Sequence, residues 1–233
     1  MGEGRRRQQR PLVLDILVRV VIAFAVLAVV THVLVRPFVV PSESMEPTIM
    51  TGDRVVARVL AVDEDDLDRG EVIAFSHGNR WEDDRIEEPN AAKDLVRYGG
   101  DLLGVGPSHT AHTVKRVVGR PGDTVSCCDS RGHLLVNGEP LDEPYVEHDL
   151  PFDTCTGGGP PSARCFPEVT VPEGSYLVLG DNRANSADSV SPCRGRGEGD
   201  EDDCTPRFVR AEQVVGVLGW RVWPLPPGSA LRD

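Results

Sequence analysis

Two serines lie close together in the stretch VPSESMEPTI, residues 40–49, with Pro41 before them and Pro47 after them. A serine hydroxyl is a weak nucleophile until a neighbouring base removes its proton. Ser42 and Ser44 therefore need a basic partner from another part of the chain before either can attack a substrate.

Histidine is the usual base, but none of the six histidines lies in a recognisable catalytic motif. Lysine is the other candidate, and the chain has only two, Lys93 and Lys115. Arginine is far more common here and cannot act as a base, because it keeps its proton in proteins. Lys115 lies within the strand-like run TVKRVVG, which favours it as the base, although an outward-facing strand lysine would have the same pattern.

A lysine with an ordinary pKa is neutral only about once in 2,500 molecules at pH 7. A catalytic lysine therefore needs its pKa lowered by roughly 2–3 units. Burial lowers the pKa of an amine because the ammonium loses its hydration. Apolar residues near Lys115 could provide this burial, and the candidates are Met45, Val114 and Val117.

The segment before the two serines resembles a membrane anchor. Residues 16–35 read ILVRVVIAFAVLAVVTHVLV, and twenty residues of helix span roughly 30 Å, the thickness of a bilayer core. Four arginines within residues 5–10 precede the apolar run, which places the N-terminus in the cytoplasm. We therefore expect a basic N-terminus at 1–15, a single-pass transmembrane anchor at 16–36 and an extracytoplasmic domain at 37–233. The alternative is a cleaved signal peptide, but no small-x-small cleavage pattern follows.

The remainder of the chain has the pattern of a mainly β protein. Strand-like runs rich in β-branched residues recur, and Asn137-Gly138 is a strong hairpin signal. No long helical periodicity appears after the anchor, so we expect an antiparallel β-sheet domain. Two charged, Gly-rich stretches near 79–112 and 191–206 lack strand pattern and are interpreted as surface insertions.

The charge is divided unevenly. The net charge is −12 overall and +4 over residues 1–36, which leaves −16 for the rest. Because phosphate contacts need Lys and Arg, so acidic a domain is a poor nucleic-acid binder. The simplest interpretation of the acidic residues is a solvated surface.

Four segments, taken in order, resemble the bacterial type I signal peptidases, which are membrane-anchored Ser/Lys proteases. PSESMEPT is similar to the nucleophile box, GDRVVARV to the strand that follows, VKRVVGRPGD to the general-base box and GDNRANSADS to the box that supports the base. The C-terminal run RFVRAEQVVGVLGWRVWP is similar to the closing strands. The resemblance covers about half of the chain and includes neither insertion and no cysteine.

The resemblance implies that Ser44 is the nucleophile and Lys115 the general base. It also implies that the Ser42 hydroxyl and the Ser44 backbone N–H form the oxyanion hole, and that Ser186 hydrogen-bonds the lysine ammonium. A peptide bond would then be cleaved by attack of one hydroxyl while the other stabilises the oxyanion.

The supporting box contains Asp181, Asn182, Arg183 and Asp188. In the family the last aspartate pairs with an arginine two residues further on, but this chain has Val190 there. The partner of Asp188 is therefore open, and the candidates are Arg116, Arg194 and Arg196.

The family cuts after small residues, usually alanine, one and three positions before the scissile bond. The resemblance therefore implies that the partners are signal peptides of exported preproteins, the lipid bilayer and a nearby export machinery, with no nucleic acid, cofactor or metal. An extended substrate would lie as a strand beside the Ser44 segment. The residues that match its pockets are Pro41, Met45, Ile49, Thr113 and Val114, which ordinary core packing would also explain.

Six cysteines follow the anchor, and on the outer side of a membrane disulfides persist. The spacing does not match a zinc site, and six cysteines allow fifteen pairings. Only a Cys193–Cys204 pair is suggested by proximity, and it would close the acidic insertion. We expect deletion of residues 194–203, with both cysteines kept, to be tolerated better than replacement of both cysteines by serine.

Two rival functions remain from the sequence. One is an anchored binding module that kept the fold without catalysis, and Val190 is the feature that favours it. The other is a self-cleaving Ser/Lys repressor of related fold, which would need a cytoplasmic chain and a DNA-binding module. The anchor and the acidic domain argue against the repressor.

Overall fold

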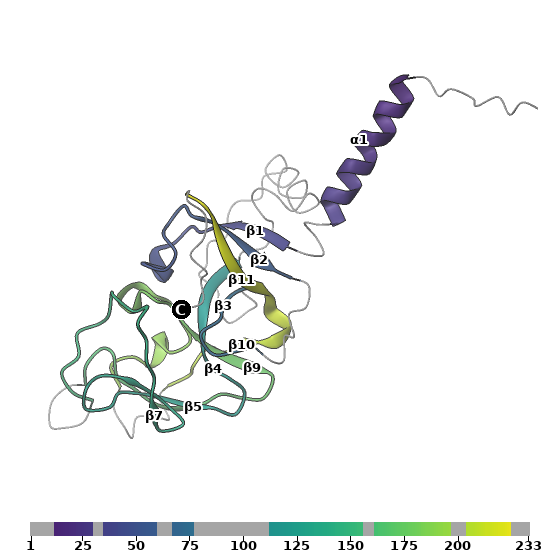
Figure 1. Cartoon of the computed structure of the whole chain (residues 1–233). Coiled ribbons are helices and arrows are strands. Elements are labelled where there is room, and N and C mark those ends of the chain that lie inside the picture. The colour runs from purple at the N-terminus through teal and green to yellow at the C-terminus, as the bar shows by residue number, and fades with distance from the viewer. Residues whose placement is uncertain are drawn as a thin grey trace, which may run out of the picture.

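The computed structural model describes residues 12–29, 35–59, 67–76, 112–155, 161–196 and 204–224. Within these ranges the chain folds as one α-helix, α1, and two antiparallel β-sheets (Figure 1). Most of the first expected insertion and residues 197–203 of the second lie outside the described residues.

The larger sheet has seven strands in the order β1-β2-β11-β3-β4-β9-β10, and every neighbouring pair is antiparallel. Its strands are rich in valine, isoleucine and leucine, which favour a pleated, buried surface. The strand carrying Lys115 is β4, in the interior of this sheet between β3 and β9. The strands are β1 (Val35–Val39), β2 (Arg54–Arg58), β3 (Val72–Ser76), β4 (His112–Gly119), β9 (Ser175–Leu179), β10 (Val209–Arg210) and β11 (Val214–Trp223).

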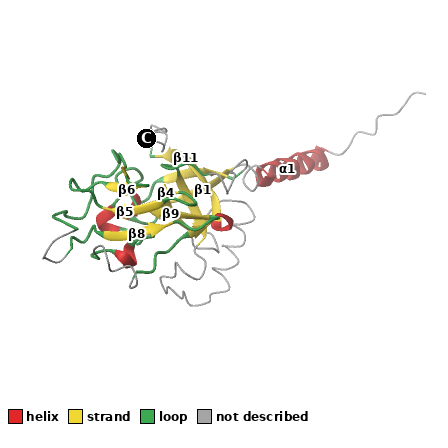
Figure 2. Ribbon diagram, turned by 90° about the horizontal axis from the view of Figure 1, so that it is seen from below, coloured by secondary structure: helices red, strands yellow, loops and turns green. Residues whose placement is uncertain are grey.

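The smaller sheet has four strands in the order β7-β6-β5-β8 and lies beside the larger one (Figure 2). The hairpin predicted at Asn137-Gly138 is confirmed: both residues have positive φ, at 54° and 79°, and they join β6 to β7. Positive φ at both turn positions matches the twist of the paired strands. The strands are β5 (Thr124–Cys127), β6 (Leu134–Val136), β7 (Glu139–Pro140) and β8 (Phe166–Thr170).

A shared core joins the two sheets. Val118 from β4 and Leu177 and Leu179 from β9 pack with Val125 from β5 and Phe166 from β8 in one buried cluster. A second cluster lies within the larger sheet and includes Ile73, Phe75 and Tyr176. A third packs the segment after β1 against β2, β3 and β11, and its members are Val40, Met45, Ile49, Val55, Ala57, Val72, Ala74 and Leu218.

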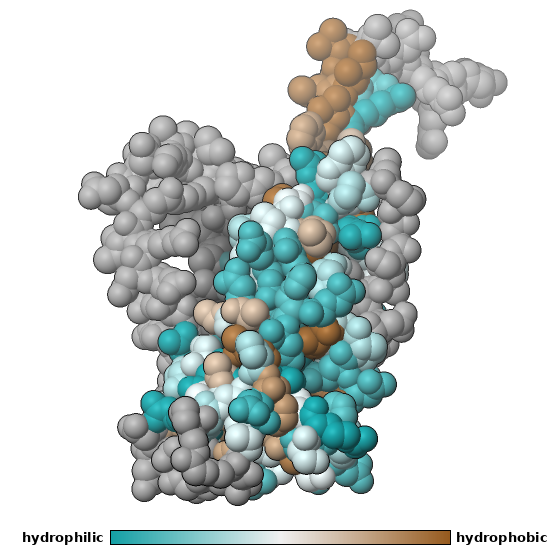
Figure 3. All heavy atoms as spheres, turned by 90° about the vertical axis from the view of Figure 1, so that its left-hand side faces the viewer, coloured by the Kyte–Doolittle hydropathy of each residue, from teal (hydrophilic) through white to brown (hydrophobic). Residues whose placement is uncertain are grey.

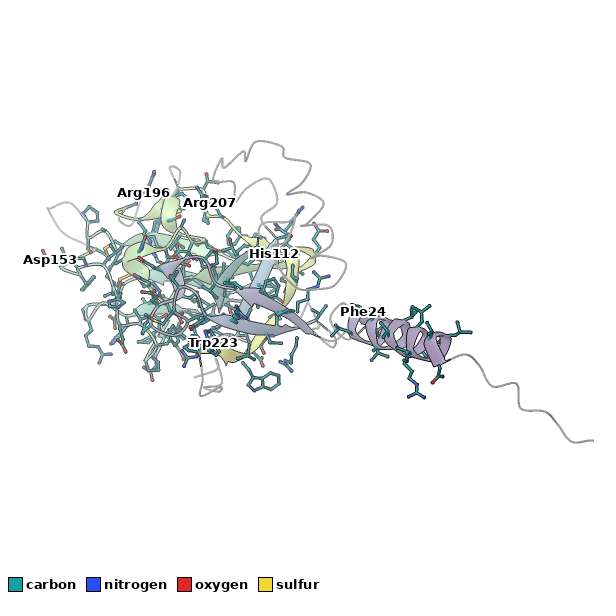
Figure 4. The ribbon with its side chains drawn as sticks, turned by 90° about the horizontal axis from the view of Figure 1, so that it is seen from above. Phe24, His112, Asp153, Arg196, Arg207 and Trp223 are labelled. Carbon is teal, nitrogen blue, oxygen red and sulfur yellow. A yellow bond between two sulfur atoms is a disulfide. The ribbon has the colours of Figure 1, made fainter. Side chains whose placement is uncertain are left out.

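The helix α1 (Leu12–Val29) stands apart from the two sheets, and most of its described apolar side chains are exposed (Figures 1 and 3). Phe24, for example, is 55% exposed and points away from the helix axis (Figure 4). Among the described residues, no helix is long and apolar enough to cross a membrane. Val35 and Arg36, expected at the end of the anchor, instead belong to β1, where they pair with β2.

All six cysteines are in disulfides, and the expected Cys193–Cys204 bridge is confirmed. The other two pairs are Cys127–Cys128 and Cys155–Cys165. The sulfurs of Cys127, Cys128 and Cys155 lie within 4.8 Å of one another, but metal binding needs thiolates, which disulfide-bonded cysteines do not offer.

Short 3₁₀ turns carry several residues singled out by the sequence. η2 (Glu43–Met45) contains Ser44, η3 (Arg183–Asn185) begins at Arg183, and η4 (Ser191–Cys193) follows Val190. A fourth turn, η6 (Ala211–Gln213), connects β10 to β11. η2 contacts both β4 and η3, so the Ser44 segment and the loop after β9 lie together beside the larger sheet.

Candidate active site

Ser44 and Lys115 are 71 positions apart in sequence and in direct contact in the fold. Lys115 Nζ donates to Ser44 Oγ across 2.5 Å. Lys115 is 3% exposed and Ser44 is 8% exposed. A neutral Lys115 in this position has its lone pair within reach of the Ser44 proton.

Burial changes the proton affinity of Lys115. Desolvation lowers the pKa of Lys115 from 10.5 to about 8, although the negative charges of Asp188 and Asp181 act in the opposite direction. Burial disfavours the ammonium because the interior solvates charge poorly. The sequence-based requirement for a lowered lysine pKa is therefore met.

The Ser44 segment is held from two sides. Beneath it, Met45 and Ile49 are fully buried in the third core cluster, and Ile49 N donates to Met45 O at 2.9 Å. From the side, Asn182 N donates to Ser44 O at 3.1 Å, and Asn182 Nδ2 donates to Glu43 O at 3.2 Å. Both anchors fix the backbone on which the Ser44 hydroxyl is carried.

Ser42 lies beside the nucleophile candidate. The hydroxyls of Ser42 and Ser44 are 3.3 Å apart, and Ser42 is exposed. An exposed hydroxyl adjoining a buried one can donate to an oxygen that arrives from solvent and stabilise negative charge on it.

Arg116, the residue after Lys115, forms a buried ion pair with Asp181. Arg116 Nε and Nη2 donate to the two carboxylate oxygens of Asp181 at 2.8 and 2.6 Å, and both side chains are at most 1% exposed. Thr48 Oγ1 also donates to Asp181 at 2.6 Å. The Tyr145 ring covers the guanidinium of Arg116 at 3.9 Å. The pair thus ties β4, the Ser44 segment and the loop after β9 together.

Arg183 supports the same loop through a different partner. Its Nε donates to Gly180 O at 2.9 Å, and its two terminal nitrogens bind the carboxylate of Glu143. Burial opposes the charge of Arg183, but Glu143 outweighs this effect and raises the pKa of Arg183. Glu143 and Tyr145 were not identified from the sequence, since their segment has no motif that distinguishes it from an ordinary polar loop.

The open partner of Asp188 is Arg194. Arg194 Nη2 donates to Asp188 Oδ2 at 3.0 Å, and Asp188 is fully buried. Of the other candidates, Arg116 is bound to Asp181 instead. Val190 packs in the core that joins the two sheets, so its position is used for packing rather than for charge.

Ser186 lies close to the Ser44 backbone, although the hydrogen bond to Lys115 implied by the resemblance is not formed. The buried Ser186 Oγ has no hydrogen-bond partner among the described residues. Its location is fixed by Gly180: a Cβ built at Gly180 would be 2.4 Å from both Ser186 Oγ and Ser44 O. Gly180 therefore lets the supporting loop approach the Ser44 segment.

Gly180→Ala is expected to lower activity on the order of 100-fold, because displacing reacting groups by about 1 Å has this effect. The added methyl must push away Ser44 O or Ser186, and backbone yields little. Gly219→Ala is the matched control, since a Cβ there meets nothing within 4 Å. Equal rates of peptide cleavage for the two variants would show that this close approach is not needed.

The residues expected to line substrate pockets differ in exposure. Pro41 is exposed, and Thr113 and Val114 at the start of β4 are half-buried. Met45 and Ile49 are 1% and 0% exposed and lie in the core. They can shape a pocket from beneath, whereas Pro41, Thr113 and Val114 have surface that a peptide can contact.

The arrangement as a whole is a buried amine against a serine hydroxyl, with a second hydroxyl beside it, which is suited to acyl transfer. The family model for signal peptidases, peptidase S26, matches residues 13–223. The chain belongs to this family. The match spans both sheets and all four motifs, and the resemblance to the bacterial type I signal peptidases is confirmed.

Two relatives, from Mycobacterium tuberculosis and Staphylococcus aureus, agree with the family assignment. The chain is 36% identical over 221 residues to signal peptidase I of Mycobacterium tuberculosis, covering 86% of this chain and 72% of the relative. It is 32% identical over 219 residues to signal peptidase IB of Staphylococcus aureus, covering 91% and 90% of the two chains. A crystal structure of signal peptidase I from Enterococcus faecalis is 26% identical and covers 66% of this chain and 97% of that chain, with a TM-score of 0.34.

Proposed function

We propose that this signal peptidase family member is a serine endopeptidase that removes signal peptides from exported preproteins, with Ser44 as nucleophile and Lys115 as general base. The observation that carries the proposal is the 2.5 Å contact between Lys115 Nζ and Ser44 Oγ, with both residues buried. The lowered pKa of Lys115 supports it.

In the first step, neutral Lys115 takes the proton of Ser44 as Oγ attacks the carbonyl carbon of the scissile peptide bond. The oxyanion that forms accepts hydrogen bonds from the Ser42 hydroxyl and the Ser44 backbone N–H, each worth about 2.7–4 kcal/mol. The Lys115 ammonium then protonates the leaving amine, and an acyl-enzyme on Ser44 remains. Water, activated by the neutral Lys115, hydrolyses that ester and frees Ser44.

The substrate binds as an extended strand beside the Ser44 segment and the start of β4. Alanine or another small residue one and three positions before the cut fits the shallow pockets around Pro41, Thr113 and Val114, with Met45 and Ile49 beneath. The apolar segment that begins at residue 16 and ends before β1 serves as the single-pass anchor. The arginine-rich N-terminus is then cytoplasmic, and the acidic domain faces outward. A bilayer and a nearby export machinery then present the preprotein close to Ser44.

The test is cleavage of a preprotein carrying Ala-x-Ala before the mature sequence, using the full chain in detergent. Wild type should release a product whose N-terminus directly follows the second alanine. Ser44→Ala should leave the preprotein intact. If wild type binds the preprotein without cleaving it, the chain is a binding module and the proposed function is wrong.

Activity should rise with pH through an apparent pKa of about 8, the pKa of Lys115. The sign follows from the mechanism, since only neutral Lys115 accepts the Ser44 proton and the ammonium predominates below this pH. The measurement is the pH profile of kcat/KM, with and without a histidine-modifying reagent. A profile that follows a pKa near 6.5 and collapses on histidine modification would contradict the lysine assignment.

A further inference from the structure

The buried carboxylate of Asp188 obtains its counter-charge from an unusual source. Asp188 is fully buried, and an isolated charge in such a position is costly. The ion pair comes from Arg194, six residues further on, and Arg194 is 14% exposed at its side chain. The intervening Val190 is fully buried in the core, so the chain turns back to reach Asp188.

Several contacts hold Arg194 where it can make this ion pair. Just before it, Ser191 Oγ and Cys193 N donate to the backbone oxygens of Asp188 and Val190 at 2.9 and 2.8 Å, closing the turn η4. Directly after Arg194, Gly195 N donates to Cys165 O at 2.8 Å. The Cys193–Cys204 disulfide fixes the residue next to Arg194 to the far end of the insertion. In the view of Figure 4, Arg196 and Arg207 lie on the same side of the domain.

The Arg194–Asp188 ion pair has fewer hydrogen bonds than the Arg116–Asp181 ion pair. Arg116 binds Asp181 through two hydrogen bonds, whereas Arg194 binds Asp188 through one. Among the described residues, Asp188 Oδ1 and Arg194 Nε have no hydrogen-bond partner. The position of Arg194, and hence the neutralisation of Asp188, therefore depends on the loop that carries it.

The charged side chains around Lys115 form ion pairs with one another. Asp181 is neutralised by Arg116, and Arg183 is bound to Glu143. Asp188 and Asp181 both favour the Lys115 ammonium, Asp188 more strongly. An unneutralised Asp188 would hold the proton on Lys115 more tightly, because an opposite charge nearby stabilises the ammonium.

We propose that Arg194, held in place by the Cys193–Cys204 disulfide, is a positioning residue that neutralises Asp188 and thereby helps Lys115 to release its proton. The inference rests on the proposed function for its catalytic consequence. It places a charge that the active site needs on the cysteine-closed insertion, outside the segments that resemble the family motifs.

The first test is the pH profile of preprotein cleavage by the full chain carrying Arg194→Met. The profile should move to higher pH by about 0.5–1 unit, which lowers the rate at pH 7 by about 3–10-fold and leaves the plateau at high pH nearly unchanged. Arg194→Lys should restore part of the shift. Arg196→Met is the matched control, because it removes a charge from the same loop without removing the Asp188 ion pair.

The disulfide is tested by the same measurement. Cys193→Ser with Cys204→Ser should shift the profile in the same direction, and adding Arg194→Met should shift it no further. Arg194→Met combined with Asp188→Asn should abolish the alkaline shift, since no unpaired carboxylate remains. An Arg194→Met enzyme that is slower by the same factor at every pH, or an Arg196→Met enzyme with an equal shift, would overturn the proposal.

A second readout does not depend on catalysis. The chain has only two lysines, so Lys93→Arg leaves Lys115 as the single lysine signal in an NMR spectrum of ¹³C-lysine-labelled protein. The ε-carbon of Lys115 should titrate at higher pH in Arg194→Met than in the Lys93→Arg parent. An unchanged titration refutes the role of Arg194, whereas a shifted titration in a protein that cleaves no preprotein refutes only the proposed function.

Discussion

Lys115→Arg is expected to abolish peptide cleavage as completely as Ser44→Ala, with a loss of about 1,000-fold or more in kcat/KM. Arginine keeps the positive charge and can still donate to Ser44, so a purely structural role for Lys115 would be partly preserved. It cannot accept the Ser44 proton, because its pKa is too high in any protein environment. The substitution therefore separates basicity from charge.

The control is Lys93→Arg, since Lys93 is the only other lysine in the chain and lies outside the described residues. It should retain wild-type activity. Thermal unfolding should show that Ser44→Ala and Lys115→Arg remain folded. The larger guanidinium must fit a site where Lys115 is only 3% exposed. Lys115→Met therefore serves as a second variant, which is uncharged and also unable to accept the proton. Robust cleavage by Lys115→Arg would refute the assignment of Lys115 as the base.

The contact between Ser44 and Lys115 could not be predicted from spacing, because β4 begins far along the chain from η2. Local pattern predicts several of the strands, among them β4, where Val114, Val117 and Val118 flank the lysine. It was the resemblance to a family that linked the two residues. The strand pairing Ile73↔Lys115, which fixes Lys115 in the interior of the sheet, depends on contacts across the whole chain.

Two of the strands that local pattern does not reveal share a physical reason. Both β1 and β8 contain a proline, Pro37 and Pro167, and proline argues against a central strand because it has no N–H for the ladder. Each strand lies at the edge of its sheet, where a missing donor is tolerated. The same proline rule that hides them in the sequence explains their position in the fold.

The second insertion was expected to be separable from the site once its cysteines were paired. The disulfide was predicted correctly. The deletion of residues 194–203 stays a prediction, and it would also remove Arg194, which binds Asp188. A deletion of residues 197–203 would keep that ion pair. No local pattern marks Arg194 as different from Arg196, since the distinction comes from the turn η4 and the bridge.

Asp181→Asn is expected to destabilise the fold by about 3–5 kcal/mol, the largest stability effect of any single substitution in the site. The reason is the arginine that remains: Arg116 is 1% exposed, and without Asp181 its charge is buried and unpaired. Thr48 would also lose its anionic acceptor. The loss of Asp181 should lower the pKa of Lys115 further, since this carboxylate favours the ammonium. Reduced activity would therefore reflect disorder of the Ser44 segment and not a smaller neutral fraction of Lys115.

The measurement is urea unfolding of wild type, Asp181→Asn, Arg116→Met and the double variant. The double variant should be more stable than the sum of the single effects predicts, because replacing both members of a buried ion pair leaves no isolated charge. Glu212→Gln is the matched control, since its ion pair with Arg210 is also short, at 3.0 Å, but is 63–69% exposed. That control should lose less than about 1 kcal/mol. If Asp181→Asn cost no more than Glu212→Gln, the buried ion pair would not be what holds β4, the Ser44 segment and the supporting loop together.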